Sequence, residues 1–194
     1  MFCYALDRLI ASSEVDEIIL VIREDLVSEV KGIVERRNYE KPIAYVSGGP
    51  SRSESVHHAI ICLEEKNVSD ETIVLIQDAD RPHLDERLIK EGIEKAAETG
   101  ASVTAIPCSD SVFVSKDLDH VSSYQNRETT FLAQTPQTFK LGLLKKLTFA
   151  EISTDEASQI HALGEMVSIV RGSPSNYKIN YPEDLERFAK EESK

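Results

Sequence analysis

Short apolar runs alternate with segments of helical spacing through the first half of the chain. The apolar runs lack the polar alternation of a half-exposed strand, which is typical of strands covered on both faces; they span residues 17–22, 42–47, 72–77 and 101–107. Helical periodicity begins the chain at Phe2 and returns between the runs, at about 25–37, 54–65 and 86–98. Strands and helices at this spacing predict an α/β fold with a Rossmann-like open, mostly parallel sheet and helices on both faces.

The rhythm changes after Asp110. Two short strand-like stretches, SVFVS and VSSY, flank the polar turn KDLDH, which predicts a protruding β-hairpin arm over about 110–127. Helices follow near 140–147 and 154–163, then a strand over 166–172 and a last helix that starts at Pro182. Since no linker or repeat divides the chain, residues 1–194 are expected to form a single domain.

Charge and cysteine usage exclude several classes of protein. The formal net charge is −12, the wrong sign for a protein that binds nucleic acid by neutralising phosphates. No apolar run is long enough to cross a membrane. Cys3, Cys62 and Cys108 lie far apart without CxxC spacing, so neither a disulfide framework nor a zinc site is expected. These features predict a cytoplasmic protein without membrane or nucleic-acid contacts.

The stretch SGGPSRSESVHHAI, residues 47–60, is the first candidate site. Gly48 and Gly49 end a predicted strand, and Ser53 or Ser55 is expected to begin a helix whose N–H groups could face a ligand. A plain turn that starts a helix explains the same residues. The adjacent histidines at 57 and 58 point about 100° apart on a helix, so they are not expected to chelate one metal ion.

The stretch QDADRPHL is the second candidate site. Asp78 directly follows a predicted buried strand, and open α/β sheets bind ligands at this carboxyl edge. Its carboxylate could hold Mg²⁺ or a sugar hydroxyl. The alternative is a structural aspartate that caps a turn or pairs with Arg81. Asp80 is expected to be solvated.

Three further residues could carry chemistry, although each has an ordinary explanation. Arg127 follows the arm and Lys178 lies in SNYKIN, and either could be a plain surface charge. Thr154 in STDEAS is a candidate N-cap for a helix. Only the combination of these residues with the two stretches above points to a function.

That combination resembles the 2-C-methyl-D-erythritol 4-phosphate cytidylyltransferases. The matching motifs are GGPSRSESV, DADRP, SDSV, NRETTFLAQTPQTF, STDEAS and GSPSNYKINYPEDL, in the family's order over about residues 2 to 190. The resemblance implies an enzyme that joins CTP to a sugar-alcohol phosphate and releases pyrophosphate, with Mg²⁺ as cofactor. It also implies a homodimer whose arm crosses to the partner.

The resemblance implies a role for each candidate residue. Gly49 and Ser55 would contact cytosine, with Arg52 supporting their loop. Asp78 would hold the ribose and sugar-phosphate side near Mg²⁺, with Arg81 beside it. The incoming phosphate would be held by Arg127 and Lys178, and hydrogen-bonded by Ser111 and Thr154; of these, Ser111, Arg127 and Thr154 would serve the partner's site.

The sequence also departs from the family pattern. The family opens with a strand and a Gly-rich loop whose Arg and Lys grip the triphosphate, and residues 1–194 begin after them. A polypeptide starting at Met1 is expected to have little or no activity, whereas a longer chain would supply the segment. Asp80 replaces a small residue and adds negative charge beside an anionic site. The alternatives are a ribitol-5-phosphate-type cytidylyltransferase, an inactive nucleotide-binding relative, or an unrelated α/β domain.

Overall fold

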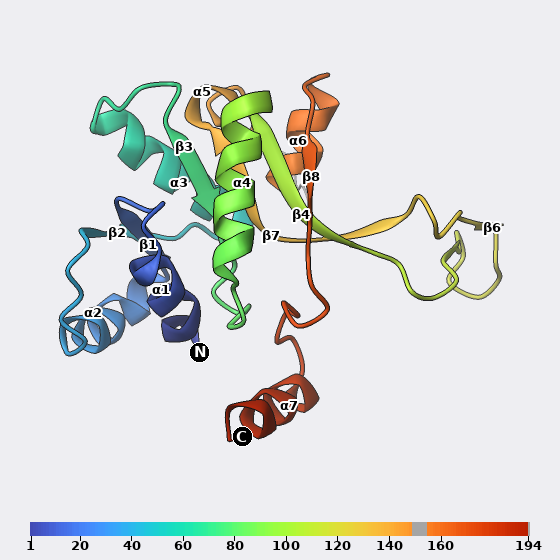
Figure 1. Cartoon of the computed structure of the whole chain (residues 1–194), viewed down its shortest axis with the longest axis horizontal. Coiled ribbons are helices and arrows are strands. Elements are labelled where there is room, and N and C mark those ends of the chain that lie inside the picture. The colour runs from blue at the N-terminus through green and yellow to red at the C-terminus, as the bar shows by residue number, and fades with distance from the viewer. Residues whose placement is uncertain (149–154, 194) are drawn as a thin grey trace.

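The computed structural model describes residues 1–148 and 155–193 (Figure 1). The strands are β1 (Ile18–Ile22), β2 (Ile43–Ser47), β3 (Ile73–Ile76), β4 (Ala101–Pro107), β5 (Phe113–Val114), β6 (Ser123–Tyr124), β7 (Phe131–Lys140) and β8 (Ser168–Arg171). The helices are α1 (Phe2–Ala11), the short 3-10 helix η1 (Glu24–Leu26), α2 (Val27–Glu35), α3 (Arg52–Glu65), α4 (Glu86–Thr99), α5 (Leu141–Leu144), α6 (Glu156–Ala162) and α7 (Pro182–Glu192).

The central sheet has four strands in the order β3-β7-β4-β8. β7 runs antiparallel to both of its neighbours, whereas β4 and β8 are parallel. β3, β4 and β8 therefore point the same way. β1 and β2 pair in parallel as a second, two-stranded sheet. The predicted α/β fold with a mostly parallel sheet is confirmed, with one antiparallel strand inside it.

Helices cover both faces of the central sheet, with α3, α5 and α6 on one face and α1 and α4 on the other (Figure 1). Val74 and Ile76 of β3 pack in the first of these layers, and Leu75 between them packs in the second. This is the period-two alternation of a strand with two covered faces. Leu88 of α4 lies at the centre of the second layer and is fully buried.

β7 is a strand that the sequence pattern did not identify. It lies between β3 and β4, and the side chains of Gln134, Thr135, Gln137 and Thr138 are at most 5% exposed. These polar residues interrupt the apolar run that would otherwise indicate a buried strand. Hydrogen bonds sustain the burial of Gln134, Thr135 and Gln137. The Gln137 Oε1, for example, accepts one from the Ala157 N–H at 3.2 Å.

The start of α3 differs from the prediction. The helix begins at Arg52 with Ser51 as its N-cap, and not at Ser53 or Ser55. The Ser51 hydroxyl accepts a hydrogen bond from the Glu54 N–H, and the Glu54 carboxylate accepts one from the Ser51 N–H. This capping box satisfies two backbone donors at once, which explains the earlier start.

The N-cap of α6 is Asp155, one residue after the predicted Thr154. The Asp155 carboxylate accepts a hydrogen bond from the Ser158 N–H at 2.7 Å. An aspartate at this position also adds negative charge to the positive end of the helix dipole. Thr154 itself lies outside the described residues.

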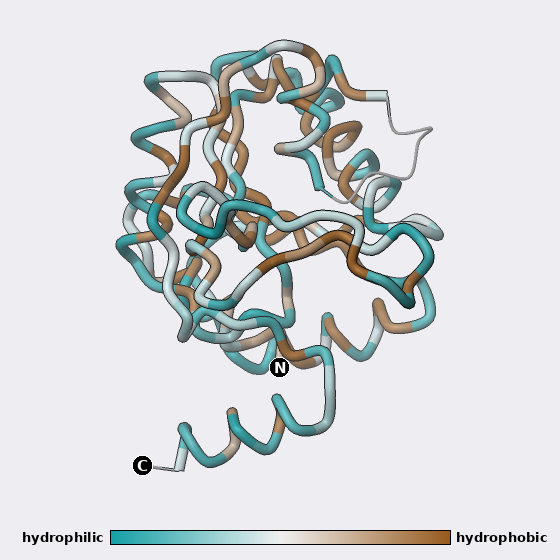
Figure 2. The backbone as a smooth tube through the Cα atoms, turned by 90° about the vertical axis from the view of Figure 1, so that its right-hand side faces the viewer, coloured by the Kyte–Doolittle hydropathy of each residue, from teal (hydrophilic) through white to brown (hydrophobic). Residues whose placement is uncertain are grey.

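The predicted hairpin arm is present and extends away from the central sheet (Figure 1). β5 and β6 pair antiparallel, with Phe113 opposite Tyr124. Figure 2, which looks onto this side of the molecule, shows hydrophobic stretches running between hydrophilic ones. Leu118 at the tip is 94% exposed and Tyr124 is 70% exposed, so the arm leaves apolar side chains uncovered.

On the side that faces the other sheet, each sheet ends in a strand that has only one partner strand. β1 pairs only with β2, and β3 pairs only with β7, within residues 1–148 and 155–193. In Figure 1, β1 lies between β2 and the four-stranded sheet. α3 contacts both strands of the smaller sheet and also packs on the cluster that includes β3. The two sheets therefore share one covering helix although no described strand joins them.

Across the described part of the chain, no helix combines the length and apolar character that crossing a membrane requires.

Leu88→Ala is expected to destabilise the fold by about 2 to 5 kcal/mol, because it leaves a cavity beneath α4. Leu163→Ala, at a position that is 51% exposed, is the matched control and should change stability by less than about 1 kcal/mol. Urea unfolding followed by circular dichroism measures both. Equal losses for the two variants would contradict the placement of the core.

Candidate active site

The candidate site lies at the carboxyl end of β3. Asp78 follows this strand and lines a cavity of about 180 Å³. Ligands of open α/β sheets bind at this edge of the sheet. The cavity is formed by residues from α3, the turn after β3, β7, the start of α6 and the segment after β8, namely Arg52, Asp78, Arg81, Ala133, Gln134, Thr135, Gln137, Asp155 and Lys178.

Three cations surround the carboxylate of Asp78. The Lys178 Nζ lies 3.3 Å from Oδ2, the Arg81 Nε lies 3.6 Å from the same oxygen, and the Arg52 Nε lies 3.4 Å from Oδ1. The Asp78 side chain is only 15% exposed. Each cation comes from a different segment of the chain, so this one carboxylate brings together residues up to 126 positions apart (Arg52 to Lys178).

Other carboxylates balance this positive charge. Asp80 Oδ2 lies 3.4 Å from the Lys178 Nζ, so Asp80 is paired and not simply solvated as its sequence suggested. Glu156 receives two 2.8 Å hydrogen bonds from Arg52 Nη1. Burial opposes the charge of Arg52, but the carboxylates of Glu156 and Asp78 raise its pKa above the ordinary value. The cations of the site are therefore held in place by the carboxylates of Asp78, Asp80 and Glu156.

A buried polar network fixes the segment that carries Lys178. The Arg81 Nη1 donates to the Asn176 carbonyl at 2.8 Å, and the fully buried Asn176 donates from Nδ2 to the Thr135 carbonyl at 2.8 Å. The Ile179 N–H donates to the Asp80 carbonyl at 2.9 Å. The residues on both sides of Lys178 are therefore tied to β7 and to the turn after β3.

The loop before α3 is closely packed around Gly49. A Cβ at this position would lie 2.4 Å from the Glu54 Cβ, so only glycine fits. The Gly49 N–H donates to the Ser55 Oγ at 3.1 Å, and the Ser55 hydroxyl donates to the Ser51 carbonyl at 2.9 Å. The structure thus brings Gly49, Ser55 and Arg52 together on one loop and helix start, beside the cavity that contains Asp78.

Two of the remaining predicted site residues lie away from the cavity, and the third is not described. Ser111 and Arg127 are exposed residues of the arm and do not line the cavity. Thr154 is outside the described residues, although its neighbour Asp155 lines the cavity. The described structure therefore gathers Arg52, Asp78, Arg81 and Lys178, and separates the arm residues from them.

Sequence reasoning missed several buried polar residues of the site. Glu156, Gln137 and Asn176 received no role, yet all three are at most 2% exposed and contact or line the cavity region. All three stand in motifs that were noted for other residues, namely STDEAS, NRETTFLAQTPQTF and SNYKIN. The sequence did show a carboxylate or an amide side chain close to a candidate residue in each motif. Sequence alone cannot tell whether such a side chain is buried at a site or exposed at the surface.

Within the described ranges, no group of three or more His, Cys, Asp or Glu side chains forms a ready metal cluster. His58 Nδ1 lies 2.8 Å from the Ser47 carbonyl oxygen, consistent with a structural part at the start of α3. The three cysteines are free. A divalent ion at this site would therefore be coordinated by Asp78 and by oxygen atoms of a bound substrate.

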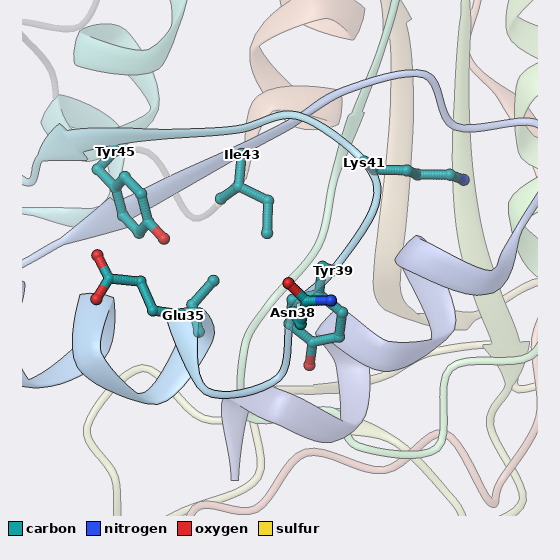
Figure 3. Close-up of a pocket in the computed structure, with 7 residues that line it drawn as sticks. Glu35, Asn38, Tyr39, Lys41, Ile43 and Tyr45 are labelled. Carbon is teal, nitrogen blue, oxygen red and sulfur yellow. The ribbon is translucent and has the colours of Figure 1, made fainter.

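A larger cavity of about 330 Å³ lies at the other end of β2 (Figure 3). Figure 3 shows the Glu35 carboxylate and the Tyr45 hydroxyl near one another, with Lys41 extending away from them. The Lys41 Nζ donates to the carbonyls of Leu9 and Ser12. Burial, with Asp7 as hydrogen-bond partner, raises the pKa of Tyr39 to about 12. Lys41 is the one cation among the residues that line this cavity, and the cavity lies away from the carboxyl end of β3. The smaller cavity beside Asp78 is therefore the better candidate.

Known proteins resemble the chain over nearly its whole length. A curated 2-C-methyl-D-erythritol 4-phosphate cytidylyltransferase of Thermotoga neapolitana is 36% identical over 187 residues, which is 96% of this chain and 81% of the relative. One of Alkaliphilus oremlandii is 36% identical over 88% of this chain and 73% of the relative.

Solved structures agree with the sequence relatives. The 4-diphosphocytidyl-2C-methyl-D-erythritol synthase of Anaerococcus prevotii superposes with a TM-score of 0.85 at 29% identity, covering 100% of this chain and 89% of that one. The 2-C-methyl-D-erythritol 4-phosphate cytidylyltransferase of Francisella tularensis gives 0.79 at 26% identity, with 97% and 86% covered. The model of the 2-C-methyl-D-erythritol 4-phosphate cytidylyltransferase family matches residues 1–190, and the chain belongs to this family of nucleotidyltransferase enzymes.

Proposed function

We propose that the protein transfers a cytidylyl group from CTP to 2-C-methyl-D-erythritol 4-phosphate and releases pyrophosphate. The observation that carries this proposal is the group of three cations, Arg52, Arg81 and Lys178, around Asp78 at the carboxyl edge of β3. In an acidic protein with a net charge of −12, such a local group is what an anionic substrate requires. The names of the curated relatives support the choice of substrates.

The proposed reaction is an in-line displacement at phosphorus. A phosphate oxygen of the sugar phosphate attacks the α-phosphorus of CTP; this P–O bond forms while the bond to the bridging oxygen of the β-phosphate breaks, and pyrophosphate leaves. No protein nucleophile is needed, because catalysis depends mainly on positioning and on neutralising charge. Lys178, one third exposed at the cavity, is suited to bind the incoming phosphate by exchanging Asp78 and Asp80 for phosphate oxygens.

The nucleotide and sugar ends are proposed to bind on opposite sides of Asp78. Gly49 and Ser55 would contact cytosine, and Arg52 would support their loop. Asp78 and Arg81 would face the ribose and the sugar phosphate. Gly48 and Gly49 have no side chains, so a flat base could approach the backbone of this loop.

Mg²⁺ is the proposed cofactor, with Asp78 as its protein ligand. Mg²⁺ prefers oxygen ligands and is usually held by one or two carboxylates together with substrate phosphates. The Asp78 carboxylate lines the cavity, and Lys178 and Arg81 would turn from it to the phosphates, so the residues fit this ion. When bound, Mg²⁺ would neutralise charge on the leaving pyrophosphate.

The triphosphate end of CTP needs further cations. The family's Gly-rich loop with its Arg and Lys has no counterpart in residues 1–194, and the matched part of the Thermotoga relative is 81% of its length. Among the described strands, β1 and β3 each have an edge without a partner strand where the two sheets face each other.

The arm is proposed to form a homodimer, in which Ser111, Arg127 and Thr154 act at the partner's site. Its apolar side chains support this, because exposed apolar patches commonly mark interaction surfaces; Phe113, Leu118 and Tyr124 are 53%, 94% and 70% exposed. Ser111 and Arg127 do not line the cavity of their own chain. Three free cysteines suit the reducing cytoplasm in which we propose that the protein works.

Lys178→Ala is expected to lower kcat by a factor on the order of 10² or more, because it removes a charge contact to the transition state. Pyrophosphate release with CTP, Mg²⁺ and the methylerythritol phosphate measures this. Lys146→Ala is the matched control, since Lys146 pairs with Glu165 on the surface and is 54% exposed. A fall of less than about threefold for Lys178→Ala would count against its role.

Mixed dimers test whether Arg127 acts across the subunit interface. Arg127→Ala and Lys178→Ala homodimers should both be nearly inactive. A refolded mixture should regain activity, because about half of the subunits then sit in heterodimers, each of which has one site with both cations intact. Steady-state rates of the mixture, compared with those of the separate variants, measure the recovery. An active Arg127→Ala homodimer, or no recovery on mixing, would contradict the shared site.

A further inference from the structure

Glu156 is a buried carboxylate to which the proposed reaction gives no role. It is 0% exposed, and among residues 1–148 and 155–193 it is the only acidic side chain in the buried class. It is the first residue of α6, directly after Asp155, which lines the cavity. A fully buried acid is rare unless it is paired, so its partner indicates what it does.

That partner is Arg52, and the pairing is specific. The Arg52 Nη1 lies 2.8 Å from both carboxylate oxygens of Glu156, while the Arg52 Nε lies 3.4 Å from the Asp78 Oδ1. One guanidinium thus spans from the start of α6 to the end of β3. Because the group is planar and rigid, anchoring one end sets the direction of the other.

Stability alone does not account for this arrangement. Buried ion pairs are often no more stabilising than well-packed apolar residues of the same volume. Here, however, the Glu156 carboxylate neutralises the charge of Arg52 at the Nη1 end of the guanidinium. Arg52 therefore needs only one oxygen of Asp78. The second oxygen, Oδ2, lies beside Lys178 and Arg81, on the proposed sugar-phosphate side.

We propose that Glu156 is a positioning residue for the transfer reaction. It holds Arg52 so that the guanidinium orients Asp78, and it thereby couples the loop of Gly49 and Ser55 to the sugar-phosphate side of the site. This inference rests on the proposed function. It adds a link between α6 and the nucleotide loop that none of the proposed substrate contacts supplies.

The test compares Glu156→Gln with the double variant Arg52→Gln/Glu156→Gln. Glu156→Gln keeps the shape but leaves the charge of Arg52 unmatched, and kcat should fall about tenfold or more. The double variant leaves no unmatched charge, so its melting temperature should be at least that of Glu156→Gln. Its kcat should stay low, because Asp78 no longer has the Arg52 guanidinium to orient it. Glu165→Gln, which breaks the surface pair with Lys146, is the control and should keep wild-type kcat.

A second readout does not depend on turnover. The ¹⁵N–¹H signal of the Arg52 Nε–H should be visible and slow to exchange in the wild type and in Glu165→Gln, and it should be lost or exchange at least tenfold faster in Glu156→Gln. Retention of this signal in Glu156→Gln would overturn the inference even if the variant were unstable.

The kinetic outcomes separate this inference from the proposed function. A wild-type protein that releases no pyrophosphate would overturn the function, and the inference with it. An active wild type with Glu156→Gln within twofold of its kcat would overturn the inference alone. A double variant with wild-type kcat would also overturn the inference alone, because Arg52 and Glu156 would then do no more than neutralise each other.

Discussion

The carboxylate of Asp78 is the point on which the site depends. Cations from α3, from the turn after β3 and from the segment after β8 all meet it, at 3.3 to 3.6 Å. Without such a partner, three like charges at one sheet edge would repel each other. The Asp78 side chain, which is 15% exposed, therefore keeps three cations together at one sheet edge of a chain with a net charge of −12. In the proposed reaction, Lys178 and Arg81 become available when phosphate oxygens replace this carboxylate.

β7 lines the cavity that contains Asp78 and its three cations. Its polar residues Gln134, Thr135 and Gln137 are at most 5% exposed and also line the cavity. The Thr135 hydroxyl oxygen accepts a hydrogen bond from the Asp78 N–H at 3.1 Å, and the Thr135 carbonyl accepts one from Asn176. The strand at the centre of the sheet is thus also the element that fixes Asp78 and the Lys178 segment. These hydrogen bonds favour one arrangement of Asp78, β7 and the Lys178 segment.

Apolar periodicity predicted most of the fold because both faces of the sheet are covered. β1, β2, β3, β4 and β8 fall within one or two residues of the expected runs. β7 was missed because its burial is polar, and the N-caps Ser51 and Asp155 were misplaced because hydroxyls and carboxylates cluster at both helix starts. Asp78, Arg81 and Lys178 were found through motifs, whereas Glu156 was not, since only three-dimensional packing reveals that a glutamate in STDEAS is buried. The assigned roles of Ser111, Arg127 and Thr154 stay predictions, because they depend on a partner subunit.

The proposed site joins CTP to a methylerythritol phosphate. The most direct test is pyrophosphate release by protein of verified intact mass, with CTP and Mg²⁺, and with 2-C-methyl-D-erythritol 4-phosphate or ribitol 5-phosphate in parallel. We expect pyrophosphate release that requires CTP and is at least tenfold faster with the methylerythritol phosphate. Faster release with ribitol 5-phosphate would contradict the assigned substrate, and no release with either would contradict the assigned activity.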